Sequence, residues 1–141
     1  MAANRHSQGI QKMIENIKSQ MRKGLLEYCL LTVISRKEAY ASDILEVLHN
    51  ADLLVVEGTV YPLLSRMKNS GLLDYRWEES PGGPPRKYFR LTAEGQSLLG
   101  QLDEEWTAIS TSINTIINSE PTGEAQTPYT DADPLFRTNK A

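Results

Sequence analysis

Several features are scarce in this 141-residue sequence, and each scarcity excludes a class of protein. Cys29 is the only cysteine, so no disulfide can form within the chain, and its place in the apolar run 25–34 favours a core residue over a nucleophile. Two histidines, His6 and His49, have no cysteine or carboxylate spacing around them that would support a metal site. No apolar run approaches the roughly 18 residues of a membrane span, and the first residues lack the apolar core of a secretory signal. We therefore expect a cytoplasmic protein without a metal ion or a membrane segment.

Catalytic groupings are missing as well. The sequence offers no nucleophile with a nearby base and no cluster of metal ligands. The pair Gly82-Gly83 is flanked by prolines, which indicates a turn and not a loop that cradles phosphates. The sequence therefore predicts no enzyme, no catalytic residue and no cofactor.

The positive charge of the chain is concentrated in one stretch. The formal net charge is −3, but residues 59–90 carry six Lys or Arg against three Asp or Glu, a net +3. Residues 91–141 carry two basic and eight acidic residues, a net −6. A basic stretch suits contact with a nucleic acid duplex, although an ordinary mixed surface explains the charges equally well.

The N-terminal segment, residues 1–22, is expected to form an amphipathic helix. Its apolar residues recur at spacings of three and four with polar residues between them, and they form a narrow stripe. Such a stripe suits packing against one other helix, so we interpret the segment as a dimer arm. Gly24 is expected to mark a break or a close contact before the next segment. The stripe consists of Ile10, Met13, Ile14, Ile17 and Met21.

Two further helices are expected before the basic stretch. Residues 25–34 are apolar almost all round, which is typical of a buried central helix. Ser42 is a good N-cap for the following helix, with Asp43 favourable in its first turn. The buried side of that helix would consist of Ile44, Leu45 and Leu48.

The segment between Val56 and Ser70 has the pattern of a recognition helix. Pro62 lacks an N–H and belongs near a helix start, so we place that start between Glu57 and Thr59. After Glu57 the outer face has no carboxylate, and its hydroxyl, tyrosine and arginine groups suit phosphate positioning and base-edge contact in a major groove. The predicted DNA-contacting residues are Thr59, Tyr61, Pro62, Ser65, Arg66 and Asn69, and the predicted inner face is Val60, Leu63, Leu64 and Met67.

A two-stranded hairpin is expected after this helix. Gly71 supplies a left-handed turn, and residues 72–78 alternate as a strand. Residues 79–85 are expected to form a loop, followed by a second strand over residues 86–91. Charged residues at a hairpin tip are commonly only solvated. After a recognition helix, however, Arg86-Lys87 favours a wing that contacts a phosphate backbone or a minor groove.

The last helix is expected to dimerise the protein. Thr92 is its predicted cap, and apolar residues then recur at helical spacing for about seven turns. A long helix with such a stripe, outside a domain already complete without it, usually dimerises. The stripe consists of Leu98, Leu99, Leu102, Trp106, Ile109, Ile113, Ile116 and Ile117.

These elements predict a mainly α fold of the α+β class. A winged helix-turn-helix domain over residues 23–91 would follow the N-terminal helix of residues 1–22. The dimerisation helix would span residues 92–119. Residues 120–141 are rich in proline and poor in apolar residues, which predicts a disordered tail.

Three segments strongly resemble the PadR-like winged-helix transcriptional regulators. They are EGTVYPLLSRM (57–67), SGLL (70–73) and GPPRKYFRLTAEG (83–95), and the resemblance extends over residues 23–106. The first and last segments together are specific, whereas either alone would be a moderate indication. The resemblance implies a bacterial homodimer that represses transcription by binding a pseudo-palindromic operator in double-stranded DNA. It also implies that Thr59, Tyr61, Pro62 and Arg66 face the major groove and that Arg86 and Lys87 are wing contacts.

Two positions depart from the pattern of the family. Tyr40-Ala41-Ser42 replaces the more usual Tyr-Gly-Tyr, which bears on a backbone contact near the phosphates. Val56 stands where a capping serine is common, which should weaken the cap of the recognition helix.

The resemblance also raises the question of an effector. A few multidrug-binding relatives place a tryptophan that stacks on planar ligands across the dimer at the position of Trp106. An aromatic residue on a dimer stripe is more often part of the packed interface, so a small aromatic effector is the weaker interpretation. The alternative is regulation by protein abundance alone. The expected interface residues are Ile14, Ile17, Leu102, Trp106, Ile109 and Ile113.

The leading hypothesis is a dimeric, sequence-specific DNA-binding repressor whose two recognition helices lie about 34 Å apart. The alternative is an interaction module whose winged helix binds a protein, because a fold alone does not fix function. A basic outer helix face without carboxylates favours DNA, whereas a protein-binding version should expose apolar residues there.

Overall fold

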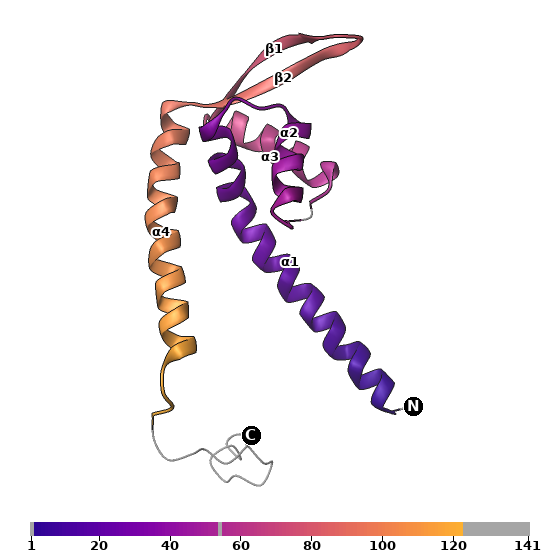
Figure 1. Cartoon of the computed structure of the whole chain (residues 1–141), viewed down its shortest axis with the longest axis vertical. Coiled ribbons are helices and arrows are strands. Elements are labelled where there is room, and N and C mark those ends of the chain that lie inside the picture. Colours follow the sequence, from indigo (N-terminus) through magenta and orange to yellow (C-terminus); the bar gives the residue numbers. More distant parts are fainter. Residues whose placement is uncertain (1, 54, 123–141) are drawn as a thin grey trace, which may run out of the picture. The chain divides into compact units, whose positions relative to one another are not determined.

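The computed structural model describes residues 2–53 and 55–122, which form four helices and one two-stranded sheet (Figure 1). This confirms the predicted mainly α fold with a winged helix. The chain divides into two compact units, Met1–Glu105 and Trp106–Ala141. Residues 123–141, which make up most of the predicted tail, lie outside the described residues. The elements are α1 (Ala2–Arg36), α2 (Ala41–Asn50), α3 (Glu57–Asn69), β1 (Leu73–Ser80), β2 (Gly83–Leu91) and α4 (Ala93–Asn118).

Helix α1 is continuous from Ala2 to Arg36, so the break expected at Gly24 is absent. A Cβ added at Gly24 would meet no neighbouring atom within 4 Å, so the alternative of a close contact is wrong as well. A glycine costs a helix interior only about 1 kcal/mol relative to alanine, and the good helix formers around it outweigh that cost. The predicted boundary between residues 22 and 23 therefore lies inside one helix.

The core lies where the C-terminal half of α1 meets α2, α3 and the base of the hairpin (Figure 1). Leu30 and Ile44 are completely buried. Cys29 packs against this core, and burial raises the pKa of its thiol, which favours the protonated form. The buried apolar residues are Leu26, Leu30, Leu31, Ile34, Ala39, Ala41, Ile44, Leu48, Val60, Leu64, Met67, Leu73, Phe89 and Leu99.

Helix α2 begins earlier than predicted, and Ser42 is not its N-cap. Tyr40 occupies the N-cap position without a side-chain cap hydrogen bond, and Ala41 is the first helical residue. The reason is a tertiary contact. The Ala39 N–H donates to the Phe89 carbonyl at 3.2 Å, and the Phe89 N–H donates back to the Ala39 carbonyl at 2.8 Å. This bridge ties residue 39 to the hairpin, and the helix starts two residues later, before Ser42 is reached.

The hairpin turn is much tighter than the predicted loop over residues 79–85. Strands β1 and β2 are antiparallel, and Ser80 pairs with Gly83, so only Pro81-Gly82 remains in the turn. Gly82 has a φ of +74°, which glycine adopts without strain. The two prolines after Gly83 are compatible with a strand because each strand of a two-stranded sheet is an edge with one unpaired side.

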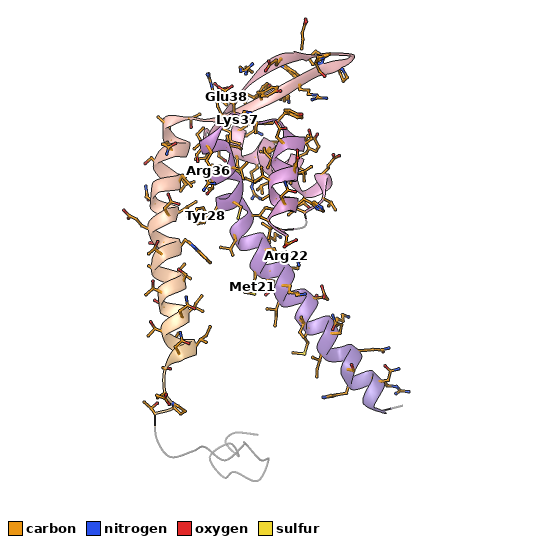
Figure 2. All side chains as sticks on the ribbon, in the orientation of Figure 1. Met21, Arg22, Tyr28, Arg36, Lys37 and Glu38 are labelled. Atoms are coloured by element: carbon orange, nitrogen blue, oxygen red, sulfur yellow. The ribbon has the colours of Figure 1, made fainter. Side chains whose placement is uncertain are left out.

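The first half of α4 is attached closely to the winged helix. Thr92 caps the helix as predicted, because its hydroxyl accepts a hydrogen bond from the Gly95 N–H at 3.1 Å. A Cβ added at Gly95 would overlap the Leu72 carbonyl, so this approach requires glycine. The hydroxyl of Tyr28, labelled in Figure 2, donates to the Asp103 carboxylate at 2.5 Å.

Two negative findings concern residues 2–53 and 55–122 only. None of the helices formed by these residues is long and apolar enough to cross a membrane. The same residues contain no group of His, Cys, Asp or Glu side chains that could hold a metal ion.

Candidate nucleic-acid interface

Helix α3 carries the predicted contact residues on its outer surface. Val56 occupies the N-cap position without a side-chain cap hydrogen bond, and the helix starts at Glu57, within the range that the sequence predicts. Its inner face anchors it to the core. Thr59, Tyr61, Pro62, Ser65, Arg66 and Asn69 are all exposed, whereas Val60, Leu64 and Met67 are buried.

Pro62 lies deeper in α3 than its chemistry favours. It is the sixth residue of the helix, beyond the first turn, in which a missing N–H would leave no hydrogen bond unmade. Its ring nitrogen cannot donate the hydrogen bond that would otherwise join it to the Gly58 carbonyl. Burial of the inner face of α3 on both sides of this position holds the helix together despite the missing bond.

One edge of α3 faces the hairpin, and the two enclose a groove of about 410 Å³, which we call the wing groove. Tyr61 and Ser65 line its α3 side, and Arg86 and Lys87 line its β2 side. Two of the predicted helix residues are thus brought together with both predicted wing residues. No carboxylate is among the lining residues, which are Tyr40, Ala41, Ser42, Tyr61, Ser65, Trp77, Pro84, Pro85, Arg86, Lys87 and Phe89.

The opposite edge of α3 faces α1. There the guanidinium of Arg66 forms an ion pair with Glu27 of α1. The sequence gives no local signal for this pair because 39 residues separate the two partners. Thr59 lies on the same edge and lines a second groove together with α1. The predicted contact residues are therefore divided between two edges, with Pro62 and Asn69 between them.

Three of the six cations in residues 59–90 are paired with carboxylates. Hydrogen bonds to the Glu38 and Glu78 carboxylates raise the pKa of Arg76. The pKa of the Asp74 carboxyl is lowered, first by the hydrogen bond that the Tyr75 N–H donates and then by Arg90. In each pair, the carboxylate offsets the positive charge of the arginine. The pairs are Arg66 with Glu27, Arg76 with Glu38 at 2.8 Å and Glu78 at 2.9 Å, and Arg90 with Asp74 at 3.2 Å.

The other three cations lie against aromatic rings. The Lys87 Nζ is 4.6 Å from the centre of the Tyr75 ring and 5.3 Å from that of Trp77. The Arg86 guanidinium is 4.7 Å from the Tyr40 ring centre. An aromatic face holds a cation in place without cancelling its charge. The third such contact places Lys68 5.6 Å from the Tyr75 ring.

The predicted dimer and effector residues lie in different environments: some are exposed, and one packs against the core. Ile14 and Ile17 are exposed on the N-terminal half of α1. Leu102, in contrast, is half-buried and packs against the core of the winged helix. In the second unit, taken by itself, the exposed stripe includes Trp106, Ile109 and Ile113.

Comparison with known proteins relates this arrangement to one family. The sequence model of the "Transcriptional regulator PadR-like family" matches residues 30–101. A PadR-like transcription factor from Bacteroides fragilis is 54% identical, with a TM-score of 0.62, over 72% of this chain and 98% of that chain. A PadR-like transcriptional regulator from Bacillus cereus is 35% identical, with a TM-score of 0.65, over 72% of this chain and 99% of that chain. An uncharacterised protein from Lysinibacillus sphaericus is 25% identical over 101 residues, which are 70% of this chain and 93% of that protein.

A recognition helix beside a two-stranded wing, with free cations on the wing, defines a winged helix-turn-helix protein of the DNA-binding class. The chain belongs to the PadR-like family of transcriptional regulators. This confirms the resemblance found in the sequence. The members of the family matched here are transcriptional regulators and not enzymes.

Proposed function

We propose that this protein is a homodimeric cytoplasmic repressor that binds a pseudo-palindromic operator in double-stranded DNA. The observation that carries the proposal is the wing groove, in which Tyr61 and Ser65 of α3 face Arg86 and Lys87 of β2 without a carboxylate between them. With α3 in a major groove, the hydroxyls of Tyr61 and Ser65 would reach base edges or phosphates. The two wing cations would then lie beside the adjacent phosphates.

The surface of α3 supports DNA over a protein as the partner. Three of its four aliphatic side chains, Val60, Leu64 and Met67, are buried, and the fourth, Leu63, is half-buried. A protein-binding surface should expose side chains of this kind. In α3 the outer surface consists mainly of hydroxyl, amide and charged groups instead, with Tyr61 as its one large exposed hydrophobic residue.

A second copy of the chain completes the proposal. The stripe on the N-terminal half of α1 is exposed, with Met13 and Met21 at 63%. An apolar stripe of this length is a common mark of an interaction surface. Two-fold symmetry would place two α3 helices about 34 Å apart, which corresponds to half-sites one helical turn apart.

The experiment selects fragments of the source genome with the purified full-length protein and measures their binding by gel shift. We expect Tyr61→Ala and the double variant Arg86→Gln/Lys87→Gln to bind the selected fragments at least about tenfold more weakly, because each variant removes a contact to bases or phosphates. The matched control is Arg36→Gln/Lys37→Gln, which removes the same charge next to Glu38, Asp43 and Glu46. If the wild-type protein selects no fragments, or if both test variants bind them as the wild type does, the proposal is wrong.

The proposal that a planar effector releases the DNA depends on Trp106, whose exposed fraction is 43%. The chain has two tryptophans, so Trp77→Phe leaves Trp106 as the only tryptophan reporter. We expect proflavine, a planar aromatic cation, to quench its fluorescence when no DNA is present. Unchanged fluorescence would contradict the effector role and leave the DNA-binding proposal intact.

A further inference from the structure

The edge of α3 that faces α1 borders a second groove, of about 440 Å³, which we call the α1 groove. Arg22 and Lys23 of α1 line one side of it, and Thr59 of α3 lines the other. Like the wing groove, it has two cations and no carboxylate in its lining. The full lining is Ser19, Arg22, Lys23, Leu26, Val55, Val56 and Thr59.

A third groove, at the C-terminal end of α1, shows that this charge pattern is not general. It also contains an adjacent Arg-Lys pair, Arg36 and Lys37. Three carboxylates, from Glu38, Asp43 and Glu46, line the same groove and outnumber the two cations. Figure 2 labels Arg22 near the middle of α1 and Arg36 and Lys37 at its C-terminal end. Of these three grooves, the two without carboxylates are those that flank the recognition helix.

The ion pair between Arg66 and Glu27 reduces the positive charge that α3 itself offers on this edge. Arg66 is the only arginine of α3, and Glu27 offsets its charge. Within residues 2–53 and 55–122, Arg22 and Lys23 have no ion pair, so their charges remain available. The positive charge on the α1 side of α3 therefore comes mainly from α1.

Helix geometry keeps this basic surface apart from the apolar stripe. At about 100° per residue, Lys23 leaves α1 about 150° from the line through Ile14, Ile17 and Met21, and Arg22 leaves it on the flank, about 100° from that line. A second subunit that covers the stripe would leave Lys23 and the α1 groove uncovered. The two surfaces of α1 can therefore be occupied at the same time.

We propose that Arg22 and Lys23 bind the phosphates of the DNA strand that borders the major groove on the side of α3 away from the wing. The inference rests on the proposed DNA binding. A helix in a major groove about 12 Å wide has a phosphate backbone along each edge. Arg86 and Lys87 of the wing would contact the phosphates along one edge, and Arg22 and Lys23 of the α1 groove would contact those along the other edge. Such contacts fix the position of α3 and carry no sequence information themselves.

The test compares three double variants of the full-length protein, each of which replaces an adjacent Arg and Lys by Gln. They are Arg22→Gln/Lys23→Gln, Arg86→Gln/Lys87→Gln and the control Arg36→Gln/Lys37→Gln. Binding is measured by fluorescence anisotropy over a salt series, with a mixed-sequence duplex of about 30 base pairs and with the fragments selected from the genome. Circular dichroism and molecular mass verify that each variant is folded and assembled as the wild type is.

We expect Arg22→Gln/Lys23→Gln to weaken binding to both duplexes by a similar factor, about tenfold. The slope of log affinity against log salt should fall by about 0.9 for each phosphate that the variant no longer neutralises, about 1.8 per subunit. The control should keep the affinity and the slope of the wild type.

The outcomes separate this inference from the proposed function. If Arg22→Gln/Lys23→Gln binds as the wild type does while Arg86→Gln/Lys87→Gln is weakened, the α1 contact is wrong and DNA binding stands. If Arg36→Gln/Lys37→Gln is weakened equally, the effect is one of net charge and the assignment to the α1 groove is overturned. If the wild type binds neither duplex, the proposed function itself is wrong.

Discussion

Both halves of α1 carry apolar residues, but in different surroundings. In the N-terminal half, Ile14 and Ile17 are 43% and 53% exposed, whereas in the C-terminal half Leu30 and Ile34 are 0% and 3% exposed. Helical periodicity predicts that a face will be covered, but it does not say by what. The C-terminal half is covered by α2, α3 and the hairpin of the same chain. Within the described residues of the unit Met1–Glu105, no element buries the stripe of the N-terminal half.

This difference separates two sources of stability. A helix that packs on nothing is marginal in water even at about 15 residues, so the N-terminal half of α1 depends on its C-terminal half or on a partner. The C-terminal half gains its stability from the core of the winged helix. Folding of one copy and association of two copies should therefore respond to different substitutions in the same helix.

The largest effect is expected for Leu30→Ala. Because Leu30 is completely buried, the truncation should lower the free energy of unfolding by about 2–5 kcal/mol. Urea denaturation followed by circular dichroism measures it, at a protein concentration low enough to favour the monomer. The matched variant Ile17→Ala, in the same helix, should change the monomer by less than about 0.5 kcal/mol. Equal losses in the two variants would remove the distinction between the two halves.

Ile17→Ser should act on association instead. If a second copy buries Ile17, its replacement removes about 1.5–3 kcal/mol from the association free energy. Sedimentation equilibrium should show a shift toward the 15.8 kDa monomer, and the melting temperature should become less dependent on protein concentration. Asn16→Ser, on the polar side of the same helix, is the control. An unchanged monomer–dimer equilibrium in Ile17→Ser would place the interface on another surface.

The features that the sequence predicts correctly are those with a local cause. The start of α3 at Glu57 lies within the predicted range, and Glu57 is favourable in the first turn of the helix. Gly71, with a φ of +78°, ends α3 as its lack of a side chain predicts, and Thr92 caps α4 through its own hydroxyl. Each of these positions is determined within a few residues of chain.

The features that the sequence does not predict have a tertiary cause. Ser42 does not take its predicted capping role because Ala39 pairs with Phe89, 50 residues away. The sequence does not reveal that Arg66 pairs with Glu27 of α1, 39 residues away. The candidate site changed accordingly, because its basic surface depends on which cations have a carboxylate partner, and no local pattern reveals that.

Gly95→Ala tests how the first half of α4 joins the winged helix. Because the added Cβ would overlap the Leu72 carbonyl, the backbone must shift, and we expect a loss of about 1–3 kcal/mol in the free energy of unfolding. Gly100→Ala is the control in the same helix, since its Cβ would meet no neighbouring atom within 4 Å. The control should gain up to about 1 kcal/mol from helix propensity. A gain in both variants would show that α4 does not depend on the close approach at Gly95.

The smallest expected effect on stability comes from a single carboxylate, that of Asp74 in the hairpin. The one ion pair recorded in the N-terminal half of α1 is local, between Lys18 and Glu15, whereas Asp74 has its partners within the hairpin. The pKa of Asp74 is lowered, first by the hydrogen bond from the Tyr75 N–H and then by Arg90. A lowered pKa in the folded state means that this carboxylate stabilises the fold above its unfolded pKa, and that this stability is lost as the pH falls through the folded pKa.

Asp74→Asn should therefore be less stable than the wild type at neutral pH and should match it once the pH lies below the folded pKa of Asp74. Melting curves between neutral and acidic pH measure this convergence. Glu79→Gln removes the same charge from the same hairpin and has no ion pair recorded in the described part of the chain. If Glu79→Gln converges with the wild type in the same way, the acid-dependent stability belongs to the net charge of the hairpin and not to the contacts of Asp74.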